Sequence, residues 1–343
     1  MQQPLKGQIA LVAGATRGAG RGIAIELAAA GAKVYCTGRS TRGAIATAGR
    51  PETIDETAEM IVAAGGSAVA VRVDHTVPGE VEALAARLRR DEGRLDVLVN
   101  DIWGGDEVIG WEHKFWQLDI PTVRAVLEQA MMSHLITSRY LAPMMVEAKR
   151  GLIVEVTDGE MPGYRGQLLY DLVKSSVNRL AYGMAWDLLG TGVTALAVSP
   201  GFLRSEAMLD RFGVTEANWR DGAKKDPAFI HSETPRYTGR AIAALAADPA
   251  VGAKAGMALF TDDLAQMYGF TDVDGSQPHF WKNIERWLDG ELAKPVIADG
   301  ARFIAKARYG HIHLLPSRAE QARRYRDALG LTGLGQGLQP IGS

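Results

Sequence analysis

The amino-acid sequence predicts an α/β fold, a Rossmann-type doubly wound parallel sheet within a single domain. Short apolar or β-branched runs recur along the chain, and stretches with helical periodicity separate them. Runs without polar alternation are typical of parallel strands that are covered on both faces. Because strand and helix candidates alternate up to residue 198, a parallel sheet with right-handed crossovers is the economical topology.

The predicted elements follow one another in regular order. Strands are expected at 9–13, 33–37, 68–73, 95–99, 151–156, 193–198 and, at the sheet edge, 257–261. Helices are expected at 21–30, 51–64, 78–90, 120–147, 170–189 and 234–247. Within the helix at 120–147, Pro143 lacks a backbone N–H and is expected to bend or interrupt the helix.

The composition is that of an ordinary soluble globular protein. The 343 residues are 47% hydrophobic and 23% charged, with a formal net charge of −2. This balance favours neither nucleic acid nor an acidic membrane surface as a partner. No apolar stretch reaches membrane-spanning length, and the N-terminus lacks the regions of a signal peptide. Cys36 is the only cysteine, which makes a buried thiol and a cytoplasmic location the expectation.

No linker separates two halves of the chain. Residues 1–277 are expected to form the nucleotide-binding and catalytic domain, and 278–343 a long, mostly helical C-terminal extension. The capping residues of 317–329 predict one helix of this extension. We expect the extension to embrace a neighbouring subunit or to cover the substrate pocket. His311 and His313 lie two apart, but no third ligand is evident, so no metal site is expected.

A glycine-rich turn follows the first strand and opens the first helix. Gly14, Gly18 and Gly20 let the backbone turn sharply and let a pyrophosphate approach the free amides of the helix N-terminus. Thr16 and Arg17 lie inside this turn and are further candidates for cofactor contact. The stretch therefore predicts a phosphate-binding site for a dinucleotide.

The end of the second strand indicates which dinucleotide is bound. NAD-binding Rossmann proteins carry an acid here for the ribose 2′-hydroxyl, whereas a cation accommodates the 2′-phosphate of NADP. This chain has Arg39 and no acid. Together with Arg17 in the glycine turn, Arg39 favours NADP. The alternative is that both arginines are solvated loop cations.

Tyr170 and Lys174 form the candidate catalytic pair. Four residues apart on a helix, they share one face and lie one turn apart. A phenol with a pKa of about 10 is a poor base near neutrality, and a neighbouring ammonium favours the phenolate. Lys174 can also donate to ribose hydroxyls. The pair suits proton transfer to or from a carbonyl or alcohol oxygen.

Together these motifs resemble the short-chain dehydrogenase/reductase family over about residues 7–205, and most of all its branch typified by dehydrogenase/reductase member 1. The resemblance implies an NADP-dependent oxidoreductase with a mobile lid at about 202–235. It also implies a set of further cofactor contacts. They are Asp74 at the adenine, Asn100 of a partial N-N-A-G motif, and Pro200, Gly201 and Ser205 near the nicotinamide.

Two nearby residues have plainer alternatives. Asp74 is about as readily explained as a turn residue or helix N-cap before Pro78. His75 is expected to be an exposed turn residue.

Two positions depart from the family pattern. Alignment of the strand at 151–156 puts Asp158 where the family has its catalytic serine, whereas counting back from the tyrosine gives Thr157. The Thr157 hydroxyl can replace the serine. An ionised Asp158 would oppose the developing alkoxide, but a carboxyl kept protonated by burial could donate the missing hydrogen bond. The family's relay asparagine is replaced by Ala130, while Ser133 and His134 are more simply helix-face residues.

The segment after the fourth strand is aromatic. Trp103, Trp111, Phe115 and Trp116 either line an apolar substrate pocket or pack the loop onto the body of the protein. The expected partners are a small carbonyl or alcohol substrate, apolar or aromatic if these rings line the pocket, and further copies of the chain in a homodimer or homotetramer. Two other functions stay open: a redox-neutral dehydratase or epimerase, and an NADP-binding regulatory protein with a decayed site.

Overall fold

The computed structural model describes residues 3–47, 49–105, 108–158 and 166–283. The predicted helix at 317–329, His311 and His313, and most of the expected extension lie outside these ranges. Among the helices of the described ranges, none is both long enough and apolar enough to cross a membrane.

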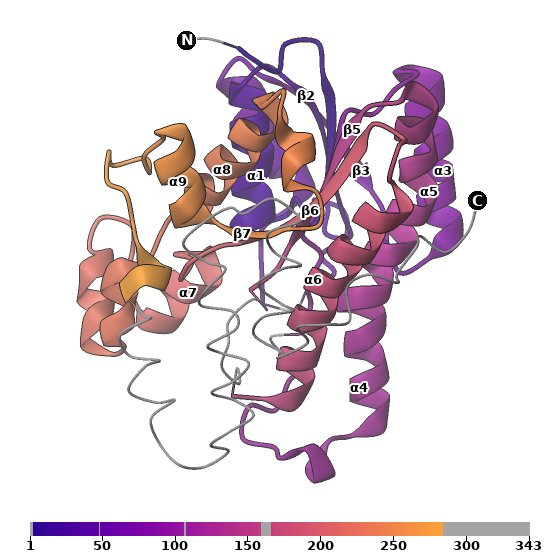
Figure 1. Ribbon diagram of the computed structural model, residues 1–343. Coiled ribbons are helices and arrows are strands. Elements are labelled where there is room, and N and C mark those ends of the chain that lie inside the picture. Colours follow the sequence, from indigo (N-terminus) through magenta and orange to yellow (C-terminus); the bar gives the residue numbers. More distant parts are fainter. Residues whose placement is uncertain (1–2, 48, 106–107, 159–165, 284–343) are drawn as a thin grey trace, which may run out of the picture. The chain divides into compact units, whose positions relative to one another are not determined.

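The described chain is built around a parallel sheet of seven strands in the order β3-β2-β1-β4-β5-β6-β7 (Figure 1). The α/β doubly wound prediction is confirmed, including a seventh strand at the edge. The strands are β1 Ile9–Ala13, β2 Lys33–Gly38, β3 Ser67–Arg72, β4 Val97–Asn100, β5 Gly151–Val156, β6 Val193–Ser199 and β7 Ala258–Phe260. The chain order reverses between β1 and β4, where α/β folds place their ligand sites.

Helices cover both faces of the sheet. The α-helices of the described ranges are α1 Gly18–Ala29, α2 Ile54–Ala63, α3 Pro78–Asp91, α4 Ile120–Leu127, α5 Ser133–Ala148, α6 Leu168–Asp187, α7 Glu206–Phe212, α8 Pro235–Ala247 and α9 Thr261–Tyr268. One buried cluster joins the sheet to α1, α2, α8 and α9. Another joins the opposite face to α3, α5 and α6.

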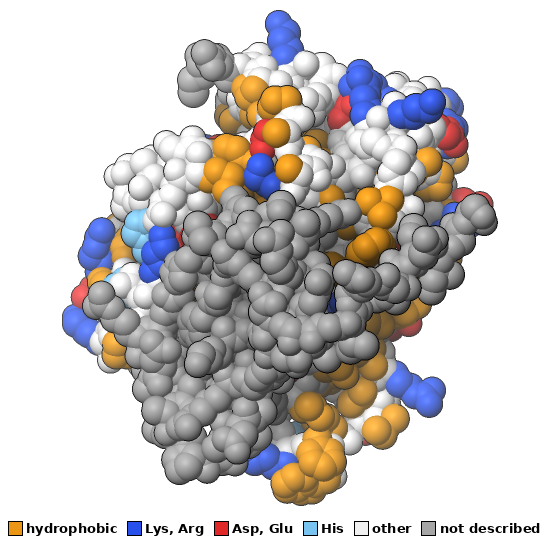
Figure 2. Space-filling model, in the orientation of Figure 1, with side chains coloured by type: hydrophobic (Ala, Val, Ile, Leu, Met, Phe, Trp, Pro, Cys, Tyr) orange, Lys and Arg blue, Asp and Glu red, His pale blue; other side chains and the backbone are white. Residues whose placement is uncertain are grey.

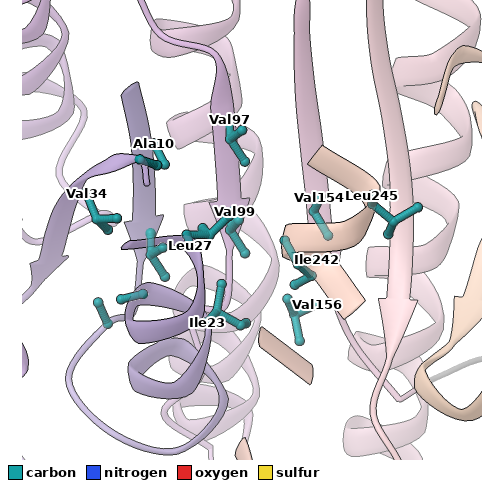
Figure 3. Packing of buried hydrophobic residues seen from close by; sticks show 14 of the residues in the cluster. Ala10, Ile23, Leu27, Val34, Val97, Val99, Val154, Val156, Ile242 and Leu245 are labelled. Carbon is teal, nitrogen blue, oxygen red and sulfur yellow. The ribbon is translucent and has the colours of Figure 1, made fainter. Parts of the chain in front are cut away.

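Strand side chains alternate between these two clusters. Ala10 and Val12 of β1 pack on the α1 and α8 side, whereas Ile9 and Leu11 pack on the α3 and α5 side. Figure 3 shows this packing on the α1 side, where Leu27 approaches the strand side chains. Every residue of β1 is buried, which explains why its sequence shows no polar alternation.

The helix expected at 120–147 has two parts. A π-helical turn, Glu128–Met132, separates α4 from α5, and Pro143 lies inside α5 without ending it. The helix is therefore not interrupted at Pro143, as had been expected, and is instead divided at the π turn. Packing explains this: Leu141, Met144 and Met145 are buried against the sheet, and each such side chain contributes about 1.5–3 kcal/mol. This offsets the roughly 3 kcal/mol cost of an internal proline.

The segment expected to be a lid contains α7 and two short 3-10 helices, Trp219–Lys224 and Pro227–His231. Its aromatic rings pack on one another. The Phe229 ring centroid lies 4.4 Å from that of Phe212 and 5.1 Å from that of Phe202. The segment thus has a small aromatic core of its own.

Candidate active site

The glycine turn is packed against the end of β4. Gly14 has φ of 94°, and a Cβ atom there would lie 2.2 Å from the Asp101 carbonyl oxygen. A Cβ atom at Gly20 would lie 2.2 Å from the Gly14 carbonyl oxygen. Neither position can hold a larger residue without moving the backbone. The helix begins at Gly18, three residues before its expected start, so the Gly18 amide belongs to the helix N-terminus.

A carboxylate lies at this helix N-terminus. The Gly18 N–H donates to Glu206 Oε2 at 2.8 Å, and Arg21 lies 3.5 Å from the other carboxylate oxygen. The unpaired amides and the helix dipole favour an anion here. Glu206 is not among the site residues predicted from the sequence. The available signal was its place directly after Ser205, which caps α7 by accepting from the Met208 N–H.

Of the two arginines expected at the cofactor, Arg17 is the N-cap residue of α1 and Arg39 directly follows β2. Arg17 donates to Thr47 at 3.1 Å and lies 3.9 Å from Glu52. Arg39 lies 4.0 Å from Asp74. Thr16 contacts the end of β2, since a Cβ atom at Gly38 would lie 2.7 Å from its hydroxyl.

Asp74 itself is a turn residue, because it accepts from the backbone N–H and the hydroxyl of Thr76, and the N-cap position of α3 is Val77. Burial opposes the ionisation of Asp74, but the Thr76 hydrogen bonds and the positive charges of Arg39 and Arg72 outweigh it. The pKa of Asp74 is therefore lowered.

Tyr170, Lys174 and Asp158 lie together. The Tyr170 hydroxyl donates to Asp158 Oδ2 at 2.5 Å, and Lys174 Nζ lies 4.0 Å from Asp158 Oδ1. The Thr157 hydroxyl instead donates to the Lys174 backbone carbonyl at 2.8 Å. Of the two candidates for the serine position, Asp158 is thus the one in contact with the phenol. Thr157 is buried between β5 and α6.

Two of the four aromatic residues surround this cluster. Trp103 lies edge-on to Tyr170, with centroids 5.4 Å apart, and Lys174 Nζ lies 4.2 Å from the Trp103 centroid. The Trp111 centroid is 5.0 Å from that of Tyr170. Phe115 and Trp116 pack on each other and are 64% and 71% exposed. Figure 2 shows exposed hydrophobic side chains gathered at the end of the molecule where α4 begins.

Asn100 and His75 belong to a buried polar layer between the sheet and α5. The Asn100 amide donates to Ser138 at 2.9 Å and to Glu155 at 2.7 Å. The expectation that His75 is exposed was wrong: it is 3% exposed, and its ring nitrogens lie 2.8 Å from the hydroxyls of Thr37 and Thr137. Sequence periodicity carries no information on how deeply a turn is covered. Burial, followed by the charge of a neighbouring histidine, lowers the pKa of His75 to about 3.

The end of β6 completes the edge of the sheet. The Pro200 carbonyl accepts from the Trp281 indole at 3.0 Å. A Cβ atom at Gly201 would lie 2.7 Å from the Glu233 carboxylate, whose pKa burial raises to about 8. Ser205 Cβ would lie 3.6 Å from a Cβ atom at Gly18. Pro200 and Gly201 thus contact the side chains of Trp281 and Glu233, and Ser205 adjoins the glycine turn.

Comparisons with known proteins agree with this architecture. The family model described as short chain dehydrogenase matches residues 8–212. Dehydrogenase/reductase SDR family member 1 of Mus musculus is 35% identical over 280 residues, covering 80% of this chain and 86% of its own length. The Homo sapiens protein of the same name is 33% identical over the same shares. A hydroxysteroid dehydrogenase structure from Escherichia coli has a TM-score of 0.60 and 25% identity, covering 75% of this chain and 95% of its own.

The glycine turn, the polar cluster at the ends of β4 and β5 and these similarities support one conclusion. The chain is an oxidoreductase that belongs to the short-chain dehydrogenase/reductase family, in the branch of dehydrogenase/reductase member 1.

Proposed function

We propose that the protein is an NADP(H)-dependent oxidoreductase that interconverts a carbonyl and an alcohol, with Tyr170 as the general acid and base. The observation that carries this proposal is the contact of Tyr170 with Asp158 and, through it, with Lys174. A proton donor, its acceptor and a cation lie together at the carboxyl edge of the sheet. This is the set that proton transfer to a substrate oxygen requires.

The residues of the glycine turn fit a dinucleotide. The backbone at Gly14 leaves no room for a side chain, and the Gly18 amide already binds a carboxylate in this structure. An anion is therefore accommodated where a pyrophosphate would bind. The positive charges of Arg17 and Arg39 support NADP, because each can pair with a 2′-phosphate. Bound NADP(H) would accept or supply the hydride.

The protein residues account for the proton. During alcohol oxidation, the substrate O–H proton passes to the Tyr170 oxygen as the Tyr170 proton passes to Asp158. During carbonyl reduction, both transfers run in reverse. Asp158 thus takes the position of the family's serine but serves as the next proton acceptor. Lys174 offsets the negative charge on the phenol and the carboxylate.

An apolar or aromatic substrate is consistent with the surroundings of Tyr170. The Trp103 and Trp111 rings lie within 5.4 Å of the Tyr170 ring, centroid to centroid. Aromatic faces of this kind bury planar or aliphatic groups efficiently.

We also infer self-association and a cytoplasmic location. Exposed apolar side chains on α4 and α6, including Ile120 and Leu172, support contact with a second copy of the chain. The single, buried Cys36 is suited to a reducing compartment.

Activity against a panel of ketones, aldehydes and alcohols tests the proposal, with NADPH or NADP followed by absorbance. We expect turnover with NADP(H), and Arg39→Ala should lower the catalytic efficiency with NADPH about tenfold while that with NADH changes less than about twofold. Equal efficiency with both cofactors in the wild type would refute the cofactor assignment. Conversion of substrate at constant NADPH absorbance would indicate a redox-neutral enzyme. Tight NADPH binding without any turnover would indicate a regulatory protein.

A further inference from the structure

A histidine–glutamate pair is buried beneath the active-site edge of the sheet. His134 Nδ1 lies 2.5 Å from Glu155 Oε2, and the two side chains are 1% and 0% exposed. Glu155 is paired in register with Asn100, the last residue of β4. The pair therefore lies at the point where β4 and β5 lead into the segments that carry Trp103 and Asp158.

Both ring nitrogens of His134 have acceptors. Nε2 lies 2.9 Å from the Ile102 carbonyl oxygen, which can only accept, so Nε2 carries a proton. The other Glu155 oxygen accepts from the Asn100 amide at 2.7 Å. Burial opposes a charge on His134, but the Glu155 charge and the hydrogen bonds to Glu155 and Ile102 outweigh it, so the pKa of His134 is raised. The raised pKa favours the imidazolium form, in which both ring nitrogens donate.

Burial alone does not produce this state. His75 lies in the same polar layer, but its partners are the hydroxyls of Thr37 and Thr137, and its lowered pKa keeps it neutral. A buried ion pair is often no more stabilising than apolar packing of the same volume. A role in holding the conformation of the neighbouring groups therefore explains the His134–Glu155 pair better than stability does. His75 thus serves as a matched control for His134.

The bond to Ile102 acts on the active site through the next residue. Trp103 lies edge-on to Tyr170 and beneath the Lys174 ammonium. In the π turn, Ala130 is buried and offers no polar side chain. The polar contact from this helix comes one turn later, at His134.

We propose that His134 is a positioning residue, which holds the Ile102 carbonyl and so fixes Trp103 against Tyr170 and Lys174. The proposal deepens the proposed function and rests on it for its effect on rate. Its effect on the Trp103 environment is independent of any activity.

Two substitutions separate the two hydrogen bonds of the ring. In His134→Asn the amide can replace Nδ1 at Glu155 but does not reach Ile102, whereas in His134→Gln it can replace Nε2 at Ile102. We expect His134→Asn to lower kcat about tenfold with the KM for NADPH changed less than about threefold, and His134→Gln to lower kcat by no more than about threefold. His75→Gln tests the loss of a buried histidine that does not contact Ile102.

A spectroscopic readout accompanies the kinetics. The near-UV circular dichroism of Trp103 is obtained by subtracting the spectrum of Trp103→Phe, in the wild type and in each histidine variant. The Trp103 signal should change in His134→Asn and be retained in His134→Gln and His75→Gln. If the wild type turns over no substrate, the proposed function fails. The Trp103 circular dichroism still tests whether His134 fixes the position of Trp103.

The opposite pattern would overturn the proposal. A larger loss of kcat in His134→Gln than in His134→Asn, or equal losses that follow the melting temperature, would show that the His134–Glu155 pair only stabilises the fold. If neither variant folds, the ¹⁵N chemical shifts of the wild-type histidines test the proposal, because they report which ring nitrogens of His134 carry a proton. Protonation at both His134 nitrogens is expected, and an Nε2 without a proton would refute the bond to Ile102.

Discussion

Glu206→Gln should tighten the binding of NADPH. The Glu206 carboxylate accepts from the Gly18 N–H at 2.8 Å and lies 3.5 Å from Arg21, at the helix terminus proposed to bind the pyrophosphate. The cofactor must displace it. An intramolecular anion in the site lowers the apparent affinity by the fraction of molecules in which the site is occupied.

The size of the effect follows from this contact. A hydrogen bond to a charged group contributes about 1.5–3 kcal/mol and a neutral one about 0.5–1.5 kcal/mol. The Glu206 side chain is 31% exposed, so solvent screens part of the difference. We therefore expect a gain of about 1 kcal/mol, or roughly fivefold in Kd.

NADPH fluorescence titration measures this change directly. Asp210→Asn is the matched control: Asp210 is on the same helix, α7, but pairs with Arg50 at 2.6 Å rather than with the glycine turn. Its Kd should stay within about twofold of the wild type. Unchanged or weaker binding by Glu206→Gln would show that the carboxylate does not compete with the cofactor.

Three further predictions concern the glycine turn, the polar layer and the catalytic cluster. Gly14→Ala should lower the free energy of unfolding by about 3 kcal/mol, because a Cβ atom would meet backbone at 2.2 Å and φ is 94°. In urea titrations Gly183→Ala should instead raise the free energy of unfolding by about 1 kcal/mol, because Gly183 lies inside α6 and a Cβ atom there meets nothing within 4 Å. Because His75 is neutral in the fold, with a pKa of about 3 against 6.5 unfolded, the unfolded state binds the extra proton between these values. Stability should fall as pH drops through this window, by up to about 1.4 kcal/mol per unit, and His75→Gln should flatten the dependence; a parallel curve would contradict the assignment. Asp158→Ser should keep kcat for carbonyl reduction within about tenfold, because Tyr170 still donates the proton and a serine hydroxyl can hydrogen-bond to the substrate oxygen; a loss equal to that of Tyr170→Phe would make the carboxyl indispensable.

The order of elements could be predicted from the sequence because strand and helix periodicities are local. The run Ile9–Ala13 and the Tyr170–Lys174 spacing each report one element, and both were predicted correctly as strand and helix. The π turn before α5 could not be predicted, because its surroundings come from distant parts of the chain: Ala130 is buried with Leu169 and Val173 of α6. Pro143 was the local signal, and packing outweighed it.

The candidate site divides in the same way. The sequence predicted that Thr157 and Asp158 both lie at the end of β5. It could not predict that the Thr157 hydroxyl turns to the α6 backbone while the Asp158 carboxyl turns to the Tyr170 phenol, because this depends on side-chain orientation. Glu206 contacts Gly18 across 188 residues of chain. His75 was misjudged for a similar reason, since the side chains that bury it come from distant segments.

The most direct test of the account is single-turnover hydride transfer by Tyr170→Phe, with NADPH binding measured in the same samples. The substitution removes only the hydroxyl that donates to Asp158. We predict unchanged cofactor affinity and a transfer rate lowered by about 10²–10⁴-fold, the range of general acid–base catalysis. A rate equal to that of the wild type would contradict the assignment of Tyr170 as the proton donor.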